Sequence, residues 1–162
     1  MAVGTLTLHR FNGDEVFAIS NATIKYFAGD EGVTLEFDVR TDPKPLKTLP
    51  DTSTLRACPN GVWQTLVPSF DVDDVSGVVY TISHGYDEDL EVYVTNFYYV
   101  EHDTIDDNEI TIFGREGSGV RAGIVGKITD VNFFDGSMPK TKVVVDAVFN
   151  VSKSAEPIEP VG

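Results

Sequence analysis

The feature that most constrains the fold is a two-residue period in side-chain polarity, which recurs along the chain and is longest in its middle. Residues 90–100 read LEVYVTNFYYV. Alternate positions of a strand point to opposite faces, so this period predicts a β-strand rather than a helix. One face would carry Leu90 with valines and a tyrosine, and the other Tyr93, Phe97 and Tyr99. Because the second face is aromatic, we expect both faces to be covered.

Shorter segments with the same character lie on both sides of this stretch, and no segment of ten residues shows a helical period. The predicted strands span residues 5–11, 33–39, 62–67, 78–83, 110–113, 120–128 and 141–151. Residues 15–27 predict one bent strand or two short ones around Ser20-Asn21. Asn12-Gly13 is a typical tight-hairpin pair. Many short strands with turn signals between them predict an all-β, antiparallel β-sandwich of jelly-roll or Greek-key type. A closed or partly open antiparallel β-barrel is the alternative.

The chain of 162 residues fits a single β domain over residues 1–151. Residues 42–61 contain four prolines and predict a long loop that crosses between sheets. Residues 152–162 predict a flexible tail. Glycines at 123 and 126, inside a predicted strand, indicate a bulge, a bend or a close approach of the backbone.

The charge balance is strongly acidic. Twelve Lys and Arg oppose 26 Asp and Glu, which gives a formal net charge of −14. Such a surface repels nucleic acid and anionic membranes and attracts a basic protein or a divalent cation. Cys58 is the sole cysteine, and the sequence shows neither a secretory leader nor an apolar run of membrane-spanning length, so we expect a soluble, cytoplasmic protein.

Residues 101–109 follow the central strand and predict an acidic loop. Calcium binds six to eight oxygen ligands, often on flexible loops, so this loop is a candidate calcium site. The candidate ligands are Asp103, Asp106, Asp107, Asn108 and Glu109. The spacing is not that of an EF-hand, and a solvated loop without metal is the simpler alternative. We therefore expect no cofactor, with calcium as the alternative.

Aromatic residues provide the second candidate site. Tyr93, Phe97 and Tyr99, together with Trp63, could anchor a partner or line the wall of a ligand cleft. The alternative is that they pack between sheets.

Catalytic motifs are not evident. The three histidines are scattered, and the sequence has neither a nucleophile elbow nor a phosphate-binding glycine loop. The leading hypothesis is a non-catalytic acidic domain that engages a basic protein partner. The alternatives are a calcium-binding β-sandwich module and a small-molecule-binding protein or enzyme with an aromatic-walled cleft. The sequence leaves the oligomeric state open.

Overall fold

The computed structural model describes residues 3–55 and 58–161, which form strands and loops without a helix. The predicted all-β class is therefore confirmed, and the described part of the chain has no helix suited to crossing a membrane. The strands are β1 (Gly4–Arg10), β2 (Gly13–Gly29), β3 (Gly32–Thr41), β4 (Asn60–Val67), β5 (Val79–Ile82), β6 (Tyr86–Asp87), β7 (Val92–Tyr93), β8 (Thr95–Tyr99), β9 (Glu101–Asp103), β10 (Asp106–Glu116), β11 (Gly119–Ile128) and β12 (Thr141–Lys153).

One large sheet has the order β5-β10-β11-β12-β1-β2-β3-β4-β8-β9, and β6 and β7 form a separate small ribbon. Two antiparallel meanders are thus joined where the last strand, β12, pairs with the first, β1. The end of β12 also pairs in parallel with β2, over Asn150–Lys153. The edge strands β5 and β9 are not paired with each other, so the sheet does not close.

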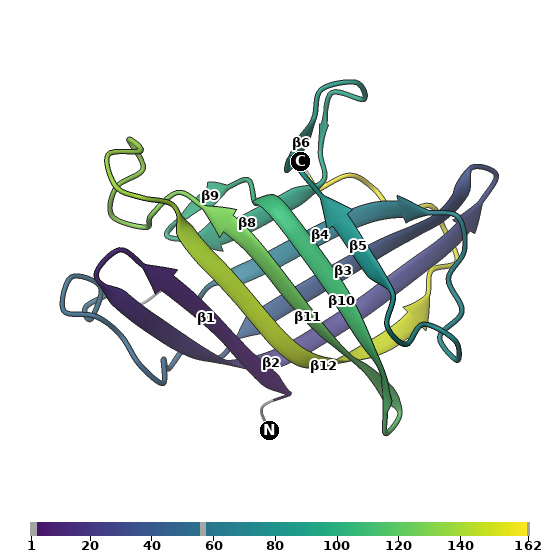
Figure 1. The fold of residues 1–162 in the computed structure, drawn as a ribbon, viewed down its shortest axis with the longest axis horizontal. Coiled ribbons are helices and arrows are strands. Elements are labelled where there is room, and N and C mark those ends of the chain that lie inside the picture. Colours follow the sequence, from purple (N-terminus) through teal and green to yellow (C-terminus); the bar gives the residue numbers. More distant parts are fainter. Residues whose placement is uncertain (1–2, 56–57, 162) are drawn as a thin grey trace.

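The sheet folds over on itself into two layers, and the strands β10–β12 cross the strands β2–β4 behind them (Figure 1). The long strand β2 serves both layers, and its pairing register shifts between Ile19 and Asn21, at the predicted bend. Between the layers, Phe37 of β3 meets Phe149 of β12 edge to face, with ring centroids 5.7 Å apart. This arrangement is consistent with the predicted sandwich.

Alternation in the sequence determines which side chains enter this core. In β12, Val143, Val145, Ala147 and Phe149 are buried, while the residues between them face outward. A side chain at Gly126 of β11 would collide with Asn108 of β10, so this glycine allows the predicted close approach.

The predicted strand over residues 90–100 is wrong in two respects. Glu91 and Val100 have φ of 56° and 70°, a region that non-glycine residues rarely adopt, so the chain turns at both ends of this stretch. Between these turns, β7 ends at Tyr93 and β8 begins at Thr95, so the stretch holds two short strands. Phe97 and Tyr99 of the aromatic face are buried, although Tyr93 is exposed. Leu90 and Val100 on the other face are exposed as well. A period of two defines two faces, but it does not say which of them meets the core.

The prediction of an acidic loop over residues 101–109 is also wrong, because most of these residues belong to strands. Its first part is β9, and its last part begins β10, where Asp107 has a φ of 52° and the register with β11 is irregular. The many charged residues hid the alternation expected of a strand, because both strands lie near the surface at this point.

The proline-rich loop does not cross between sheets. Residues 42–59 join β3 to β4, which are antiparallel neighbours over their whole lengths. The loop instead folds back on the β1–β2 hairpin, where the backbone of Val16 exchanges hydrogen bonds with Leu46 and Lys47.

The chain end extends the last strand beyond residue 151, because β12 continues to Lys153. Beyond it, Ser154 N donates to Tyr26 O at 2.7 Å, and the side chain of Gln64 donates to Glu159 O at 2.8 Å. Flexibility of residues 152–162 stays a prediction.

Candidate functional site

A groove of about 900 Å³ lies between the β6–β7 ribbon and the neighbouring parts of β4 and β5. Among the described residues, its walls include five carboxylates and no Lys or Arg, and we call it the acidic groove. The carboxylates are those of Glu31, Asp87, Glu88, Asp89 and Asp106. Leu66, Ile82 and Leu90 are among the apolar residues that line it. The groove therefore combines negative charge with apolar contact surface.

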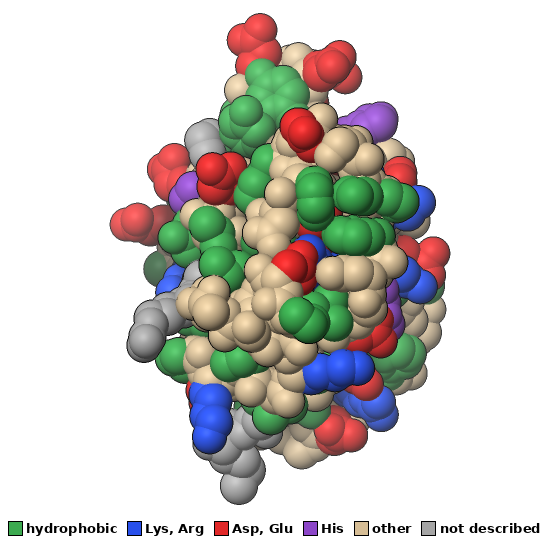
Figure 2. Space-filling view, turned by 90° about the vertical axis from the view of Figure 1, so that its left-hand side faces the viewer, with side chains coloured by type: hydrophobic (Ala, Val, Ile, Leu, Met, Phe, Trp, Pro, Cys, Tyr) green, Lys and Arg blue, Asp and Glu red, His purple; other side chains and the backbone are tan. Residues whose placement is uncertain are grey.

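The β6–β7 ribbon projects from the body of the protein (Figure 1), and acidic side chains surround apolar ones on this projection (Figure 2). The rings of Tyr86 and Tyr93 pack with centroids 4.8 Å apart. One oxygen of Asp87 accepts the backbone N–H groups of Asp89 and Leu90, both at 3.0 Å, which shapes the tip. Leu90 at this tip is 70% exposed. An apolar side chain is thus presented to solvent on a formed turn.

The base of the ribbon is tied to the sheet by backbone hydrogen bonds. Val94 N donates to Gly85 O at 2.9 Å, and Gln64 N donates to Val94 O at 2.7 Å. Gly85 N donates to the Asp106 carboxylate at 2.8 Å. The ribbon is therefore held at its base, while its tip extends outward.

Ion pairing leaves most of the groove's negative charge unbalanced. Asp106 lies 3.5 Å from Lys140 Nζ. Among the described residues, the other four carboxylates of the groove form no ion pair. A positively charged ligand would meet them without displacing an existing partner.

Of the predicted aromatic site, the structure keeps Tyr93 available and buries the rest. Tyr93 is 45% exposed and lines a second hollow of about 620 Å³ beside Asn96 and His102. Trp63, Phe97 and Tyr99 are each at most 3% exposed, so the prediction that they contact a partner or wall a cleft is corrected. They pack between the layers because β4 and β8 direct these positions inward.

The predicted calcium ligands do not form one cluster. Asn108 is buried, and its amide accepts from Trp63 Nε1 at 2.8 Å and donates to the carbonyls of Ile82 and Ile105, which corrects its assignment as a ligand. The carboxylate of Asp103 accepts the N–H groups of Thr104 and Thr129. Within residues 3–55 and 58–161, no three metal-ligating side chains gather.

The remaining candidate ligands lie apart from Asn108. Asp106 contacts Gly85 and Lys140 as described, Asp107 lies 3.8 Å from Lys127 Nζ, and Glu109 is exposed on β10. Calcium binding by these carboxylates stays a prediction.

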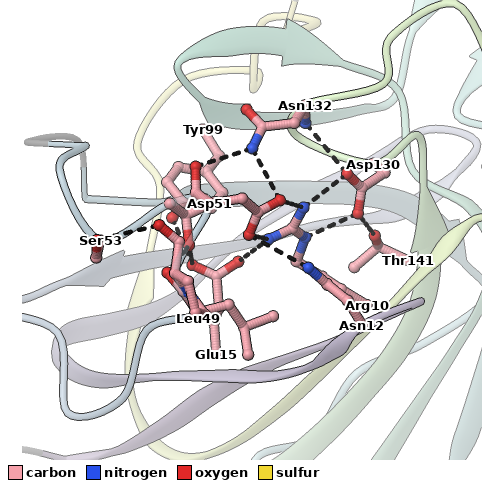
Figure 3. Close-up of polar contacts among 12 residues, drawn as sticks. Arg10, Asn12, Glu15, Leu49, Asp51, Ser53, Tyr99, Asp130, Asn132 and Thr141 are labelled. Atoms are coloured by element: carbon pink, nitrogen blue, oxygen red, sulfur yellow. Dashed lines mark hydrogen bonds and ion pairs between the residues drawn. The ribbon is translucent and has the colours of Figure 1, made fainter.

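A second group of carboxylates surrounds Arg10 at the end of β1 (Figure 3). Its guanidinium is fully buried and forms bidentate pairs with Asp51 at 2.7–2.8 Å and with Asp130 at 2.8–2.9 Å. Its Nη1 also donates to Glu15 at 3.2 Å. These contacts use all five donors of the guanidinium, which is the geometry for which arginine is suited. We call these four residues the Arg10 cluster.

Neutral donors complete the Arg10 cluster. Glu15 accepts from the hydroxyls of Thr52 and Tyr99, both at 2.8 Å. Asp130 accepts from the Thr141 hydroxyl at 3.1 Å and from the backbone N–H of Asn132. Within the described part of the chain, no buried side-chain polar atom lacks a partner. The buried polar atoms of the cluster are thus satisfied within the protein.

The electrostatics of the Arg10 cluster follow from these contacts. The hydrogen bond from Arg10 is the main reason that the pKa of Asp51 lies well below its usual value. Burial would lower the pKa of Arg10, but the hydrogen bonds and charges of Asp130 and Asp51 outweigh it and raise that pKa. Burial, with the hydrogen bond to Glu15, raises the pKa of Tyr99 above its usual value.

The sequence carried an unused signal for the Arg10 cluster. Arg10 continues the alternating set Leu6 and Leu8, and Glu15 begins the set that continues with Phe17 and Ile19. Charged residues in register with a core face indicate a buried ion pair. Asp51 and Asp130 come from distant loops, and no local pattern identifies them.

Comparison of the chain with protein-family models, with curated proteins and with solved structures finds no match. Function is therefore inferred from the acidic groove and the Arg10 cluster.

Proposed function

We propose that this chain is a non-catalytic binding domain that engages a basic protein partner through the acidic groove and the β6–β7 ribbon. The observation that carries the proposal is the composition of the groove wall, where the described residues include five carboxylates and no Lys or Arg. Unbalanced negative charge attracts a cationic segment from a distance and speeds its association.

The exposed tip of the ribbon supports the same proposal. Leu90 and the Tyr86–Tyr93 pair supply apolar surface beside the charges. Interfaces bind most tightly where apolar and aromatic anchors are surrounded by polar groups that exclude water. A partner segment with lysine or arginine next to apolar side chains would satisfy both parts of the site.

Calorimetric titration with a basic peptide tests this proposal. The probe is an acetylated and amidated peptide of alternating lysine and valine, about eight residues long. We expect binding that weakens about tenfold between roughly 0.05 M and 0.5 M salt, because salt screens exposed charges. A peptide with glutamate in place of lysine should not bind.

Variants locate the interaction. The triple change Asp87→Asn, Glu88→Gln and Asp89→Asn should weaken peptide binding about tenfold at low salt, since it removes three of the five groove charges. The matched control is Asp74→Asn, Glu109→Gln and Glu116→Gln, which removes three exposed charges outside the groove. Equal weakening by both triple variants, or binding that is indifferent to salt, would reject the proposal.

A further inference from the structure

The two edges of the large sheet differ in how they are protected. The edge strand β9 is three residues long, carries Glu101 and Asp103, and follows Val100 in its left-handed conformation. Short length, charge and a kink are the features by which natural sheets prevent an edge from pairing with another chain. The β9 edge is therefore guarded.

The edge strand β5, at four residues, is also short, but it lacks the other two protections, charge and a kink. Residues 78–83 read VVYTIS, without a charge or a proline. These residue types favour strands. β5 pairs with β10 on one side and is the last strand of the sheet on the other. Val79 is 50% exposed, and Thr81 is also exposed. The outer edge of β5 is thus available to pair with another strand.

The acidic groove lies against this open edge. Thr81 and Ile82 of β5 line the groove together with the five carboxylates. On the far side of the groove, β4 pairs with β8 only as far as Trp63, so no described strand pairs with Leu66 on the side away from β3. Ile158 and Pro160 of the chain end also line the groove. The groove beside β5 is therefore negatively charged and bordered by apolar residues.

Resting on the proposed function, we infer that a basic segment of the partner binds as an added β-strand along the free edge of β5. Backbone hydrogen bonds to β5 would hold the segment in register, as in other cases of strand addition. Lysine or arginine side chains of the segment would reach the carboxylates of the groove. Side chains on its other face would contact apolar residues such as Leu66 and Leu90.

Charge selects this occupant over a second copy of the chain. The protein has a formal net charge of −14, and its own β5 edge carries no positive charge. Two such edges would bring two acidic grooves together, and like charges at close range oppose association. The groove therefore favours a cationic strand from another protein.

N-methylation of the peptide tests the inference separately from the proposed function. In a strand the N–H groups of alternate residues point to opposite edges. In the alternating peptide, one variant is methylated at the lysine amides and the other at the valine amides. Methylation on the paired edge should weaken binding about 30-fold, and methylation on the other edge at most about threefold.

Hydrogen exchange provides the readout on the protein. The unmodified peptide should slow amide exchange in β5 and leave exchange in β9, the control edge, unchanged. If both methylated peptides bind as well as the unmodified one, or both lose binding equally, strand addition along one edge is overturned while the proposed function stands. If exchange in β5 is unchanged in the complex, the position is overturned.

Two further results have distinct meanings. Failure of the unmodified peptide to bind at about 1 mM rejects the proposed function itself, and the inference with it. Sedimentation that shows a dimer without peptide, with slowed exchange in β5, would replace the basic segment by a second copy and overturn the inference.

Discussion

The Arg10 cluster and the acidic groove both gather carboxylates, but they differ in what surrounds them. In the Arg10 cluster a buried guanidinium donates to all three carboxylates, and neutral donors fill the remaining positions. In the acidic groove five carboxylates line a space of about 900 Å³, and no Lys or Arg from residues 3–55 and 58–161 lies in its wall. A group of acidic residues is therefore structural where the fold places a cation among them. Where the fold places no cation among them, the carboxylates stay available to a partner.

The largest expected effect comes from removing the cation of the Arg10 cluster. Arg10→Ala leaves Glu15 and Asp130, both buried, without their charge partner, and should lower the free energy of unfolding by about 3–5 kcal/mol. Urea denaturation measures this change. The control is Arg115→Ala, whose exposed pair with Asp73 should contribute less than about 0.5 kcal/mol. Comparable stability of Arg10→Ala and the wild type would show that the cluster does not hold the fold together.

A smaller loss is expected when the loop over residues 42–59 is released from the cluster. Asp51→Asn keeps the shape of the side chain but removes its charge towards Arg10, and should cost about 1–2 kcal/mol, because Asp51 is partly exposed. Asp42→Asn in the same loop, which makes no contact with Arg10, is the control. Equal denaturation midpoints for the two variants would contradict the clamping role of Asp51.

The ribbon should respond in the opposite way, with altered binding and unaltered stability. Leu90→Ser removes an exposed side chain, so the unfolding free energy should stay within about 0.5 kcal/mol of the wild type. Affinity for the alternating lysine–valine peptide should fall about tenfold if Leu90 becomes buried on binding. The control is Leu46→Ser, which alters an exposed leucine outside the groove, on the loop over residues 42–59. Val79→Ser on β5 is unsuitable as a control because it alters the proposed edge. Unchanged affinity for Leu90→Ser would remove the ribbon from the binding site.

The smallest effect is a pH dependence at the alkaline side of the Arg10 cluster. The pKa of Tyr99 is raised by burial and by Glu15, so the folded state keeps its proton where the unfolded state releases it. The sign follows from linkage: this contribution is present below the unfolded pKa of about 10 and is lost as pH rises above it. The unfolding free energy of the wild type should therefore fall more steeply between about pH 9 and 11 than that of Tyr99→Phe. Equal slopes for Tyr99→Phe and the wild type would contradict this role of Tyr99.

The sequence predicted the all-β class because alternation in segments such as residues 33–39 and 141–151 needs only local information. It did not predict that the proline-rich loop would return to β2, or that residues 101–109 would include strands. Those outcomes depend on which strands become neighbours, and a period of two is silent on that point.

The candidate site was predictable in character rather than in position. Net charge predicted an acidic surface, and Tyr93 lies in the ribbon beside the acidic groove, whereas a basic partner stays a prediction. Trp63, Phe97 and Tyr99 were misplaced because aromatic residues in strands suit a core as well as an interface. The Arg10 cluster required contacts between residues up to 120 positions apart, as between Arg10 and Asp130, which no local pattern encodes.

The most direct test of this account is an NMR titration of the whole chain with the alternating lysine–valine peptide at low salt. We expect backbone amide shifts to change around the acidic groove, at Gln64, Thr81 and Asp87–Leu90. The amide shifts of Asn12, Asp51 and Asn132 beside Arg10 should stay unchanged. Shifts centred on the Arg10 cluster, with the groove unaffected, would contradict this account.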